Sequence, residues 1–354
     1  MSNAPLKPMR EHGYLVLSLD TELAWGYYDD DDARERLFSA DGSRERRSIE
    51  RVLALCDDQG IRATWAMVGH LFFSQCEDCA PCPVAAWRDD HRGFREVHVT
   101  GQAAQMQPAH PQLAQMQPAH PQLVHPQPAH PQWYAPDVRD LLLAASDRHE
   151  LAFHGFSHRP FHQMDADAAQ SEVQAWLAVA GRFGVKPESI VFPRNRVGHL
   201  PLFADAGFRC FRAPDRTPRW HLRRFGSALK SADDLLALST PRVYRREQLR
   251  REQGLIRVPS SAHLFDFPRG LELRLDRVGL QRLRLRGIAK AIDHAARSGG
   301  ILHLWAHPWE LRTPADEDKL EYLLGLAAEQ IAAGRLRSIT MSELSALASR
   351  TERR

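Results

Sequence analysis

Acidic and histidine side chains occur at several places in the chain, each directly after a short apolar run. The first of these places is Asp20-Thr-Glu22, which follows Tyr14-Leu-Val-Leu-Ser-Leu. Side chains alternate along a strand, so two acids separated by one residue point in the same direction. Paired carboxylates at the end of a strand can provide a metal ligand and a general base. Acids that cap a following helix give the same pattern, so this motif alone leaves both interpretations open.

A pair of histidines forms the second motif, His154-Gly-Phe-Ser-His158, after the apolar run Leu151-Ala-Phe. Two histidines at positions i and i+4 lie on one face of a helical turn, where both rings can bind one metal ion. Histidines that only pack in the core or lie on the surface are the alternative. The motif therefore makes His154 and His158 candidate metal ligands.

Two further motifs follow apolar runs, His307-Pro-Trp-Glu310 and Phe192-Pro-Arg194-Asn195. A histidine at the end of a strand is a candidate general acid, because its pKa lies near neutrality. His303 lies four residues before His307, within the apolar run that precedes it, and we interpret His303 as structural. An arginine such as Arg194 can orient a nearby carboxylate and keep it ionised, although a surface arginine after proline is the alternative.

The elements that must position these motifs alternate along the chain. Apolar runs predict strands at residues 14–20, 63–69, 151–154, 189–193, 207–212, 300–307 and 338–341. Amphipathic patterns predict helices at residues 43–58, 136–146, 166–183, 287–297 and 316–333. Such alternation indicates βαβ units and a largely parallel sheet, and about seven or eight units would close into a barrel. An open doubly wound sheet is the competing architecture. In a barrel the carboxyl ends of the strands form one face, so the four motifs would meet there.

The composition is that of a globular protein. Of the 354 residues, 43% are hydrophobic and 26% are charged, and the formal net charge of +3 is too small to indicate a nucleic-acid partner. No apolar stretch is long enough for a transmembrane helix. The polar residues 1–12 lack the apolar core of a signal peptide, so we expect a cytoplasmic protein.

One segment departs from the alternating pattern. Residues 104–113 are repeated without change at 114–123, and a degraded third copy covers 124–133. The repeat is rich in Gln, Pro and His and contains too little apolar side chain to fold alone. We interpret residues 101–133 as a low-complexity insertion in a surface loop, whose histidines could bind metal loosely.

Two other features have weaker interpretations. Cys76, Cys79 and Cys82 have metal-ligand spacing, and His70 or His91 could be a fourth ligand, but a second pair at recognisable spacing is missing. We therefore favour a reduced cysteine cluster over a structural zinc site. The Arg-rich stretch 212–257 has weak periodicity and is interpreted as a long excursion from the barrel.

The four motifs together resemble the polysaccharide deacetylase family (the NodB-homology or carbohydrate esterase family 4 group). The resemblance is to the branch whose first motif is Asp-x-Glu rather than Asp-Asp-Gly, because Thr21 stands where the common pattern has a second Asp. It extends over residues 14–344 apart from the repeats. It implies a distorted (β/α)7 TIM-like barrel, and with it one catalytic domain at residues 11–345.

The activity implied by this resemblance is a metal-dependent hydrolysis that removes N-acetyl or similar N-acyl groups from a carbohydrate. The implied roles are metal ligand for Glu22, His154 and His158, catalytic base for Asp20, catalytic acid for His307, and tether of Asp20 for Arg194. The reverse assignment, with Asp20 as ligand and Glu22 as base, stays open. The implied ion is Zn²⁺, with Co²⁺ or Mn²⁺ as other candidates.

Three side chains beside the motifs could bind the substrate. Flat aromatic rings suit sugar faces and an amide suits hydroxyl groups, which makes Trp25, Trp309 and Asn195 candidates. Tryptophans that only pack the mouth of the barrel are the alternative. Two rival functions also remain, an amidohydrolase acting on a small non-sugar amide and a non-catalytic barrel that binds glycans or a partner protein.

Overall fold

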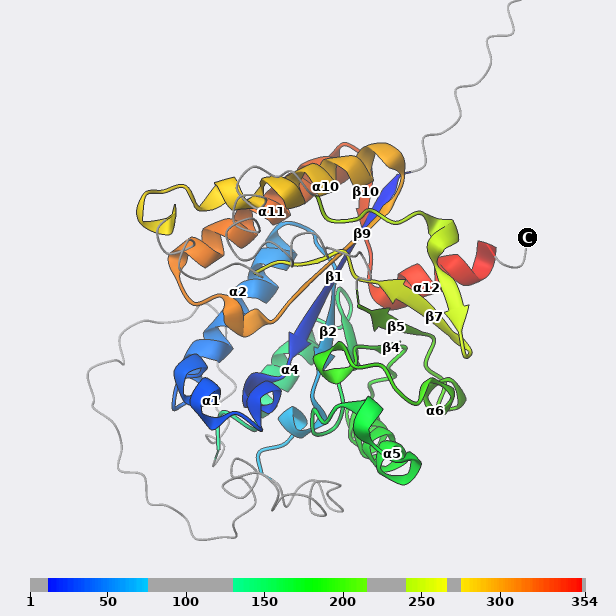
Figure 1. Ribbon diagram of the computed structural model, residues 1–354. Helices are drawn as coiled ribbons and strands as arrows, with labels where there is room; N and C mark the ends of the chain where they lie inside the picture. The colour runs from blue at the N-terminus through cyan, green and yellow to red at the C-terminus, as the bar shows by residue number, and fades with distance from the viewer. Residues whose placement is uncertain (1–11, 76–129, 215–239, 266–274, 352–354) are drawn as a thin grey trace, which may run out of the picture.

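The computed structural model describes residues 12–75, 130–214, 240–265 and 275–351. Figure 1 shows a sheet in the interior with helices packed around its outer side. The cysteine cluster and nearly all of the predicted insertion, up to residue 129, lie outside the described residues. None of the described helices is long and apolar enough to cross a membrane.

The sheet is curled and mostly parallel. Its strands are β1 (Gly13–Thr21), β2 (Ala63–Met67), β3 (Glu150–Phe153), β4 (Ser189–Ile190), β5 (Cys210–Ala213), β6 (Arg250–Glu252), β7 (Leu255–Pro259), β8 (Ala262–His263), β9 (Ile301–Ala306) and β10 (Leu336–Ser338). The order across the sheet is β6-β7-β5-β4-β3-β2-β1-β9-β8, and β10 pairs with the start of β1. Only the β6–β7 pair is antiparallel among the described strands.

The two ends of the curled sheet meet through consecutive residues. β7 pairs with β5, and β8 pairs with β9, although only Ser260 and Ser261 separate the two strands. The Ser260 N–H donates to the carbonyl of Ala213, and the Ser261 N–H donates to the carbonyl of His303. If β7 and β8 are counted as one position, the described strands fill seven parallel positions around the curl. The predicted distorted (β/α)7 barrel is therefore confirmed.

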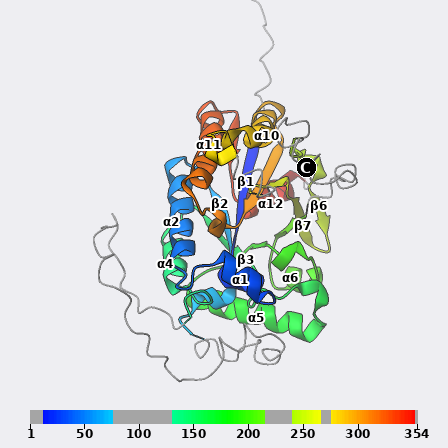
Figure 2. The same cartoon turned by 60° about the vertical axis from the view of Figure 1, so that its left-hand side comes forward.

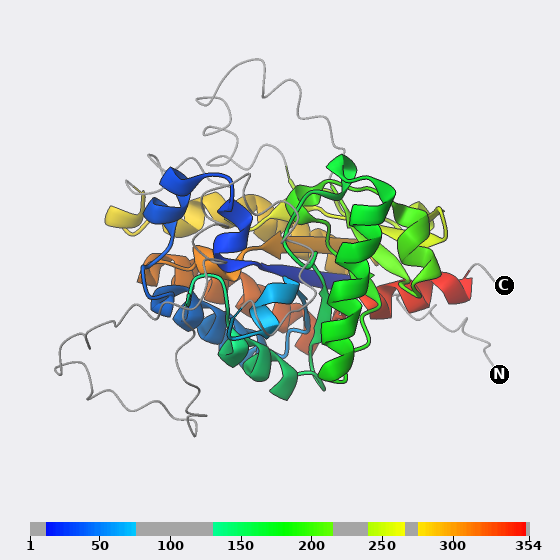
Figure 3. The same ribbon diagram turned by 90° about the horizontal axis from the view of Figure 1, so that it is seen from below.

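Helices cover the outside of this sheet, as the view from below in Figure 3 shows. They are α1 (Asp31–Leu37), α2 (Ser43–Asp58), α4 (Pro136–Ala144), α5 (Ala166–Arg182), α6 (Leu200–Asp205), α10 (Arg286–Ser298) and α11 (Pro314–Ala332). The last helix, α12 (Met341–Thr351), instead contributes Met341 and Leu344 to the cluster that contains Tyr14 and Val16. In Figure 2, α2, α4 and α11 lie along one side of the molecule. The residues of α2 are those predicted, because Ile49, Val52, Leu53 and Cys56 repeat at helical spacing and are all buried.

The side chains of β1 divide between two cores. Leu15, Leu17 and Leu19 belong to the cluster beneath the helices, whereas Tyr14 and Val16 belong to the second cluster, inside the curl. Side chains alternate in a strand, so Ser18 and Asp20 share the inner face with Tyr14 and Val16. The first acid of the Asp-x-Glu motif therefore faces the interior of the barrel at the carboxyl end of its strand.

Two predicted elements are wrong in part. The predicted strand 338–341 ends at Ser338, because Thr340 caps α12: the Thr340 N–H donates to Glu343, and the Glu343 N–H donates to the Thr340 hydroxyl. This is the capping box of a Thr-x-x-Glu sequence. The excursion predicted at 212–257 is also wrong at its end, because Leu255–Pro259 forms β7 in the sheet.

Candidate active site

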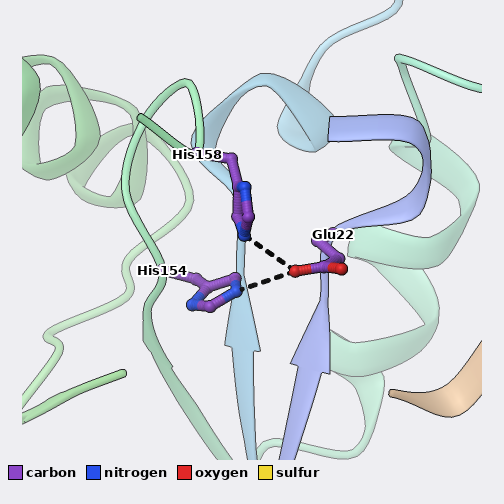
Figure 4. A group of neighbouring side chains, drawn as sticks. All are labelled: Glu22, His154 and His158. Atoms are coloured by element: carbon purple, nitrogen blue, oxygen red, sulfur yellow. Dashed lines mark hydrogen bonds and ion pairs between the residues drawn. The ribbon is translucent and has the colours of Figure 1, made fainter. Parts of the chain in front are cut away.

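Three buried side chains converge at the carboxyl ends of β1 and β3, as Figure 4 shows. Oε2 of Glu22 lies 3.2 Å from Nε2 of His154 and 2.8 Å from Nε2 of His158. All three residues are at most 4% exposed. One carboxylate oxygen and two imidazole nitrogens therefore surround one point, which is the kind of ligand set that a transition-metal ion takes.

Strand ends and a tight loop place these side chains. Glu22 follows β1 and His154 follows β3, and both strands pair with β2 between them. Gly155 has a φ of 77° and His158 a φ of 61°, so the chain turns sharply between the two histidines. The predicted helical turn is therefore wrong, because the pair is brought together by a loop with left-handed residues.

A buried carboxylate supports this loop from α5. Glu172 accepts hydrogen bonds from the N–H of Phe156 at 2.8 Å, from the N–H of Ser157 at 3.0 Å, and from the Ser157 hydroxyl. Burial raises the pKa of Glu172, although these donors oppose the effect. Glu172 thus fixes the backbone between the two histidines.

The protonation of the histidines fits a bound cation. Nδ1 of His154 lies 2.8 Å from the carbonyl of Val191, which can only accept, so Nδ1 carries a proton and Nε2, 3.2 Å from Glu22, is the ring nitrogen that could bind a metal ion. Both ring nitrogens of His158 are buried without a well-aligned hydrogen bond among the described residues. Burial lowers the pKa of His158 against the opposing charge of Glu22, which favours its neutral form. Two ring nitrogens and one carboxylate oxygen thus lie close enough to one another to bind a shared ion.

Asp20 is held by an arginine from across the barrel. Nη1 and Nη2 of Arg212, at the end of β5, lie 2.5 and 2.6 Å from the two carboxylate oxygens of Asp20. Burial alone would raise the pKa of Asp20, but the charge and hydrogen bonds of Arg212, together with the nearby His154 and His307, outweigh it and hold the pKa below its usual value. Asp20 therefore stays ionised although it is 3% exposed.

The predicted contact between Arg194 and Asp20 is wrong. Arg194 forms a bidentate ion pair with Asp29, with Nη1 2.8 Å from Oδ2, and both side chains are about one-third exposed. Arg194 has a φ of 55°, so its backbone aims the side chain towards the rim of the site rather than into the barrel. The tether that the sequence assigned to Arg194 is made by Arg212.

Further contacts fix the guanidinium of Arg212. Nη1 donates to the hydroxyl of Ser18 at 3.1 Å, and Nε donates to the amide oxygen of Asn195 at 3.0 Å. The Ser18 hydroxyl lies 2.9 Å from Nε2 of His303, whose pKa burial lowers to about 3. The neutral His303 ring can accept the Ser18 proton, which supports the structural role predicted for it.

His307 approaches the same acids from β9. Its Nε2 lies 3.5 Å from Oε1 of Glu22 and 4.0 Å from Oδ2 of Asp20. Burial alone would lower the pKa of His307, but the charges of Glu22 and Glu310 outweigh it and raise the pKa to about 10. His307 is thus placed as a proton donor facing the candidate ligand Glu22 and the carboxylate of Asp20.

A pocket of about 610 Å³ opens over these groups. Its lining includes Asp20, Glu22, Tyr27, Asp29, His158, Arg194, Asn195, Trp305 and His307. Of the residues predicted to bind substrate, only Asn195 is among these, and its amide oxygen is already used by Arg212. Trp25 is completely buried and stacks on His70, and Trp309 packs against Phe38 at 4% exposure, so their predicted substrate contacts are wrong.

Two residues that the sequence reasoning missed belong to the site. Arg212 ends a predicted strand, so the rule that selected the other motifs could have selected it. Trp305 lies on the same face of its strand as His303 and His307, and it lines the pocket while the Arg212 guanidinium covers its ring at 4.4 Å. Position at a strand end was the available signal for both.

Comparison with known proteins establishes the fold. No protein-family model matches the chain, and no curated protein matches its sequence. Among solved structures, the chain is similar to a protein from Mycobacterium smegmatis assigned as a polysaccharide deacetylase, with a TM-score of 0.52 and 14% identity over 99% of this chain and 96% of that one. It is similar to Puue allantoinase, with a TM-score of 0.51 and 13% identity over 97% of this chain and 93% of that one. The fold is therefore that of the polysaccharide deacetylases, and an allantoinase shares it.

Proposed function

We propose that this protein is a metal-dependent hydrolase that removes N-acetyl or similar N-acyl groups from a carbohydrate. The observation that carries the proposal is the meeting of Glu22, His154 and His158 at the floor of a pocket that Asp20 and His307 also line. Amide hydrolysis needs a base for water and an acid for the departing amine. The likeness of the fold to polysaccharide deacetylases supports this reaction class.

Glu22, His154 and His158 would hold the ion. We propose Zn²⁺ first, with Co²⁺ and Mn²⁺ as other candidates, because two imidazoles and one carboxylate form a common zinc ligand set that leaves a position open. When bound, the ion would make water more acidic and polarise the acyl carbonyl. The hydrogen bond from Nδ1 of His154 to the Val191 carbonyl orients the ring so that Nε2 is the nitrogen that would bind the ion.

Asp20 is the proposed base. Arg212 keeps it ionised and fixes its orientation, and Oδ2 lies 4.0 Å from Nε2 of both His154 and His307. In this position Asp20 can take a proton from water at the centre of the site. With Glu22 in contact with both histidines and Asp20 in contact with Arg212, we propose Glu22 as the ligand and Asp20 as the base.

His307 is the proposed acid. Its Nε2 faces the pocket beside both carboxylates, and a proton there can pass to the amine as the C–N bond breaks. Trp305 and Tyr27 offer aromatic surface to a sugar ring on the walls of the same pocket.

The experiment combines metal content with acetate release. Wild-type protein and His154→Ala would be assayed on N-acetylated oligosaccharides with added Zn²⁺ or Co²⁺, with His294→Ala, an exposed histidine of α10, as the matched control. We expect about one tightly held ion per chain and acetate release in wild type and control, and loss of both in His154→Ala. Absence of a tightly held metal in wild type would contradict the proposal and leave a metal-free hydrolase or a binding barrel.

A second candidate function is hydrolysis of a small non-sugar amide. The specific observation in its favour is the likeness to an allantoinase, whose TM-score is nearly the same as that of the deacetylase. The same preparations would be offered small cyclic and linear amides. Turnover of these, with metal bound but no acetate released from sugars, would favour this second function.

A further inference from the structure

A second cluster of the same composition lies on the other side of the His307 ring. Oε2 of Glu310 lies 3.0 Å from Nε2 of His263 and 3.4 Å from Nδ1 of His307. The three ligand atoms lie within 4.8 Å of one another. His263 comes from β8, and the other two residues come from the end of β9 and the turn after it.

The contacts within this cluster are short, but its ring nitrogens are not aligned for hydrogen bonds. Nε2 of His263 and Nδ1 of His307 are buried, and neither makes a well-aligned hydrogen bond within the described part of the chain, despite the short distances to Glu310. Nε2 of His158 in the first cluster has the same character. These nitrogens are buried and close to a carboxylate oxygen, but they are not aligned with it for a hydrogen bond. Ligands that surround a shared ion have this arrangement.

The cluster is also held in place by its neighbours and lies near the surface. Oε2 of Glu310 accepts the backbone N–H of His307 at 3.0 Å, which fixes the carboxylate within its own turn. The His263 ring packs against Trp305 with centroids 4.3 Å apart. The three side chains are 13–20% exposed, so the cluster lies near the protein surface although its ligand nitrogens are buried.

We propose that His263, His307 and Glu310 form a second site for a divalent transition-metal ion, and that filling it inhibits the enzyme. The inhibitory part rests on the proposed function, because it takes His307 as the acid. Two imidazoles and one carboxylate suit Zn²⁺, Co²⁺ and similar ions rather than Mg²⁺ or Ca²⁺.

Inhibition follows from the two nitrogens of one ring. As an acid, His307 carries protons on both nitrogens and gives the proton on Nε2 to the amine. An ion on Nδ1 takes the lone pair of that nitrogen and releases its proton to solvent, so the ring keeps a single N–H and cannot be an imidazolium. A ring in this state is a much weaker acid, and turnover falls.

The second site should be the weaker of the two. Its ion would bind Nδ1 of His307, while Nε2 of the same ring lies 3.5 Å from Oε1 of Glu22 in the first cluster. The two ions would therefore be close enough to repel each other. Its ligands are also more exposed to water than those of the first site. We therefore expect the first site to fill before the second, with inhibition only at excess metal.

The binding test is a titration of metal-free protein with Zn²⁺ followed by calorimetry, with Co²⁺ absorption as a second readout. Wild type should show a tight and a weak class of site. His263→Gln should lose the weak class and keep the tight one, whereas His154→Ala should lose the tight class. His294→Gln, on the exposed side of α10, is the control and should keep both.

The kinetic test compares inhibition by excess Zn²⁺. We expect wild type and His294→Gln to be inhibited, and His263→Gln to require roughly tenfold more Zn²⁺ for the same fractional loss. Glu310→Gln is the second variant should His263→Gln fail to fold, and it should lose the weak class as well. Binding of a single class by wild type, or equal binding and inhibition in wild type and His263→Gln, would overturn the proposal.

The binding data separate this proposal from the function itself. A protein with both classes of site and no turnover on any amide would contradict the hydrolase and the inhibition, but not the second metal site. Turnover together with a single class of metal site and no inhibition would support the hydrolase function and contradict the second metal site.

Discussion

Two arginine–aspartate pairs border the pocket, and they differ in burial. Arg212 and Asp20 are at most 4% exposed, whereas Arg194 and Asp29 are each about one-third exposed. An exposed ion pair contributes little because water screens it, but removing one partner of a buried pair leaves an uncompensated charge. Substitution of the arginine in each pair therefore compares a buried ion pair with an exposed one near the same pocket.

We expect Arg212→Met to lower the free energy of unfolding by about 3–5 kcal/mol, and Arg194→Met to change it by less than about 1 kcal/mol. The first substitution should also raise the pKa of Asp20, because burial then acts on it without the charge of Arg212. Urea denaturation of both variants measures the difference. Equal losses would show that Arg212 does not hold a buried charge.

Gly26 makes room for the candidate ligand Glu22. A Cβ at position 26 would lie 2.1 Å from Oε1 and 2.6 Å from Cδ of Glu22. Gly26→Ala should displace this carboxylate and weaken metal binding by roughly 10–100-fold, as loss of ligand support does elsewhere. Competition with a chelator measures the affinity.

The control for this substitution is Gly181→Ala, because a Cβ at that position in α5 meets nothing within 4 Å. It should leave the metal affinity unchanged. Unchanged affinity in Gly26→Ala as well would mean that Glu22 is not a ligand.

At the scale of elements, the loop that carries His154 and His158 depends on helix α5 for its conformation. Glu172 accepts three hydrogen bonds from Phe156 and Ser157, between the two histidines. Without these bonds the donors are buried and unsatisfied, and the loop loses its fixed backbone.

Glu172→Ala should therefore weaken metal binding by roughly tenfold or more. Gln174→Ala, an exposed position on the same helix, is the matched control. The ratio of metal affinity between the variants, taken with their thermal unfolding, is the measurement. A loss of stability with full metal affinity would show that the loop keeps its shape without Glu172.

The whole charge arrangement of the site sets its pH dependence. As an acid, His307 must be protonated, so activity should be lost as the pH rises through its pKa. Glu22 and Glu310 raise that pKa to about 10, and a cation on Glu22 would bring it lower. Asp20 has a lowered pKa and stays ionised, so the base is lost only in acid.

We expect the alkaline limb of kcat/KM to lie above the ordinary histidine pKa of about 6.5 and no higher than about pH 10. The limb should disappear in His307→Gln together with most of the activity. A pH series of kcat/KM from mild acid to alkali measures it. An alkaline limb at or below about pH 6.5 would remove His307 from the role of the acid.

The predicted insertion can be tested on the whole chain. Its first two copies are identical and poor in apolar side chains, so we expect removal of residues 104–113 to leave metal content, activity and melting temperature unchanged. Thermal melts and the acetate assay measure this. Loss of folding or activity would mean that the domain at 11–345 depends on the repeats, contrary to the prediction.

The sequence alone determined the elements and the chemistry that they carry. Periodicity placed α2 at its observed residues, and the strand-end motifs found Asp20, Glu22, His154, His158 and His307. These features are local: they depend on the alternation of side chains within a strand or on spacing within a helix. The domain bounds, the metal and the role of each residue stay predictions.

The tertiary structure decided which side chains meet. Arg212 rather than Arg194 holds Asp20, because β5 and β1 face each other across the curled sheet while Arg194 is turned to the rim. Trp305 rather than Trp25 lines the pocket, because burial depends on what packs above a ring and not on its distance from a motif. His263 reaches Glu310 only because β8 pairs with β9. Contacts between distant strands follow from their order in the sheet, which the local pattern of a sequence does not contain.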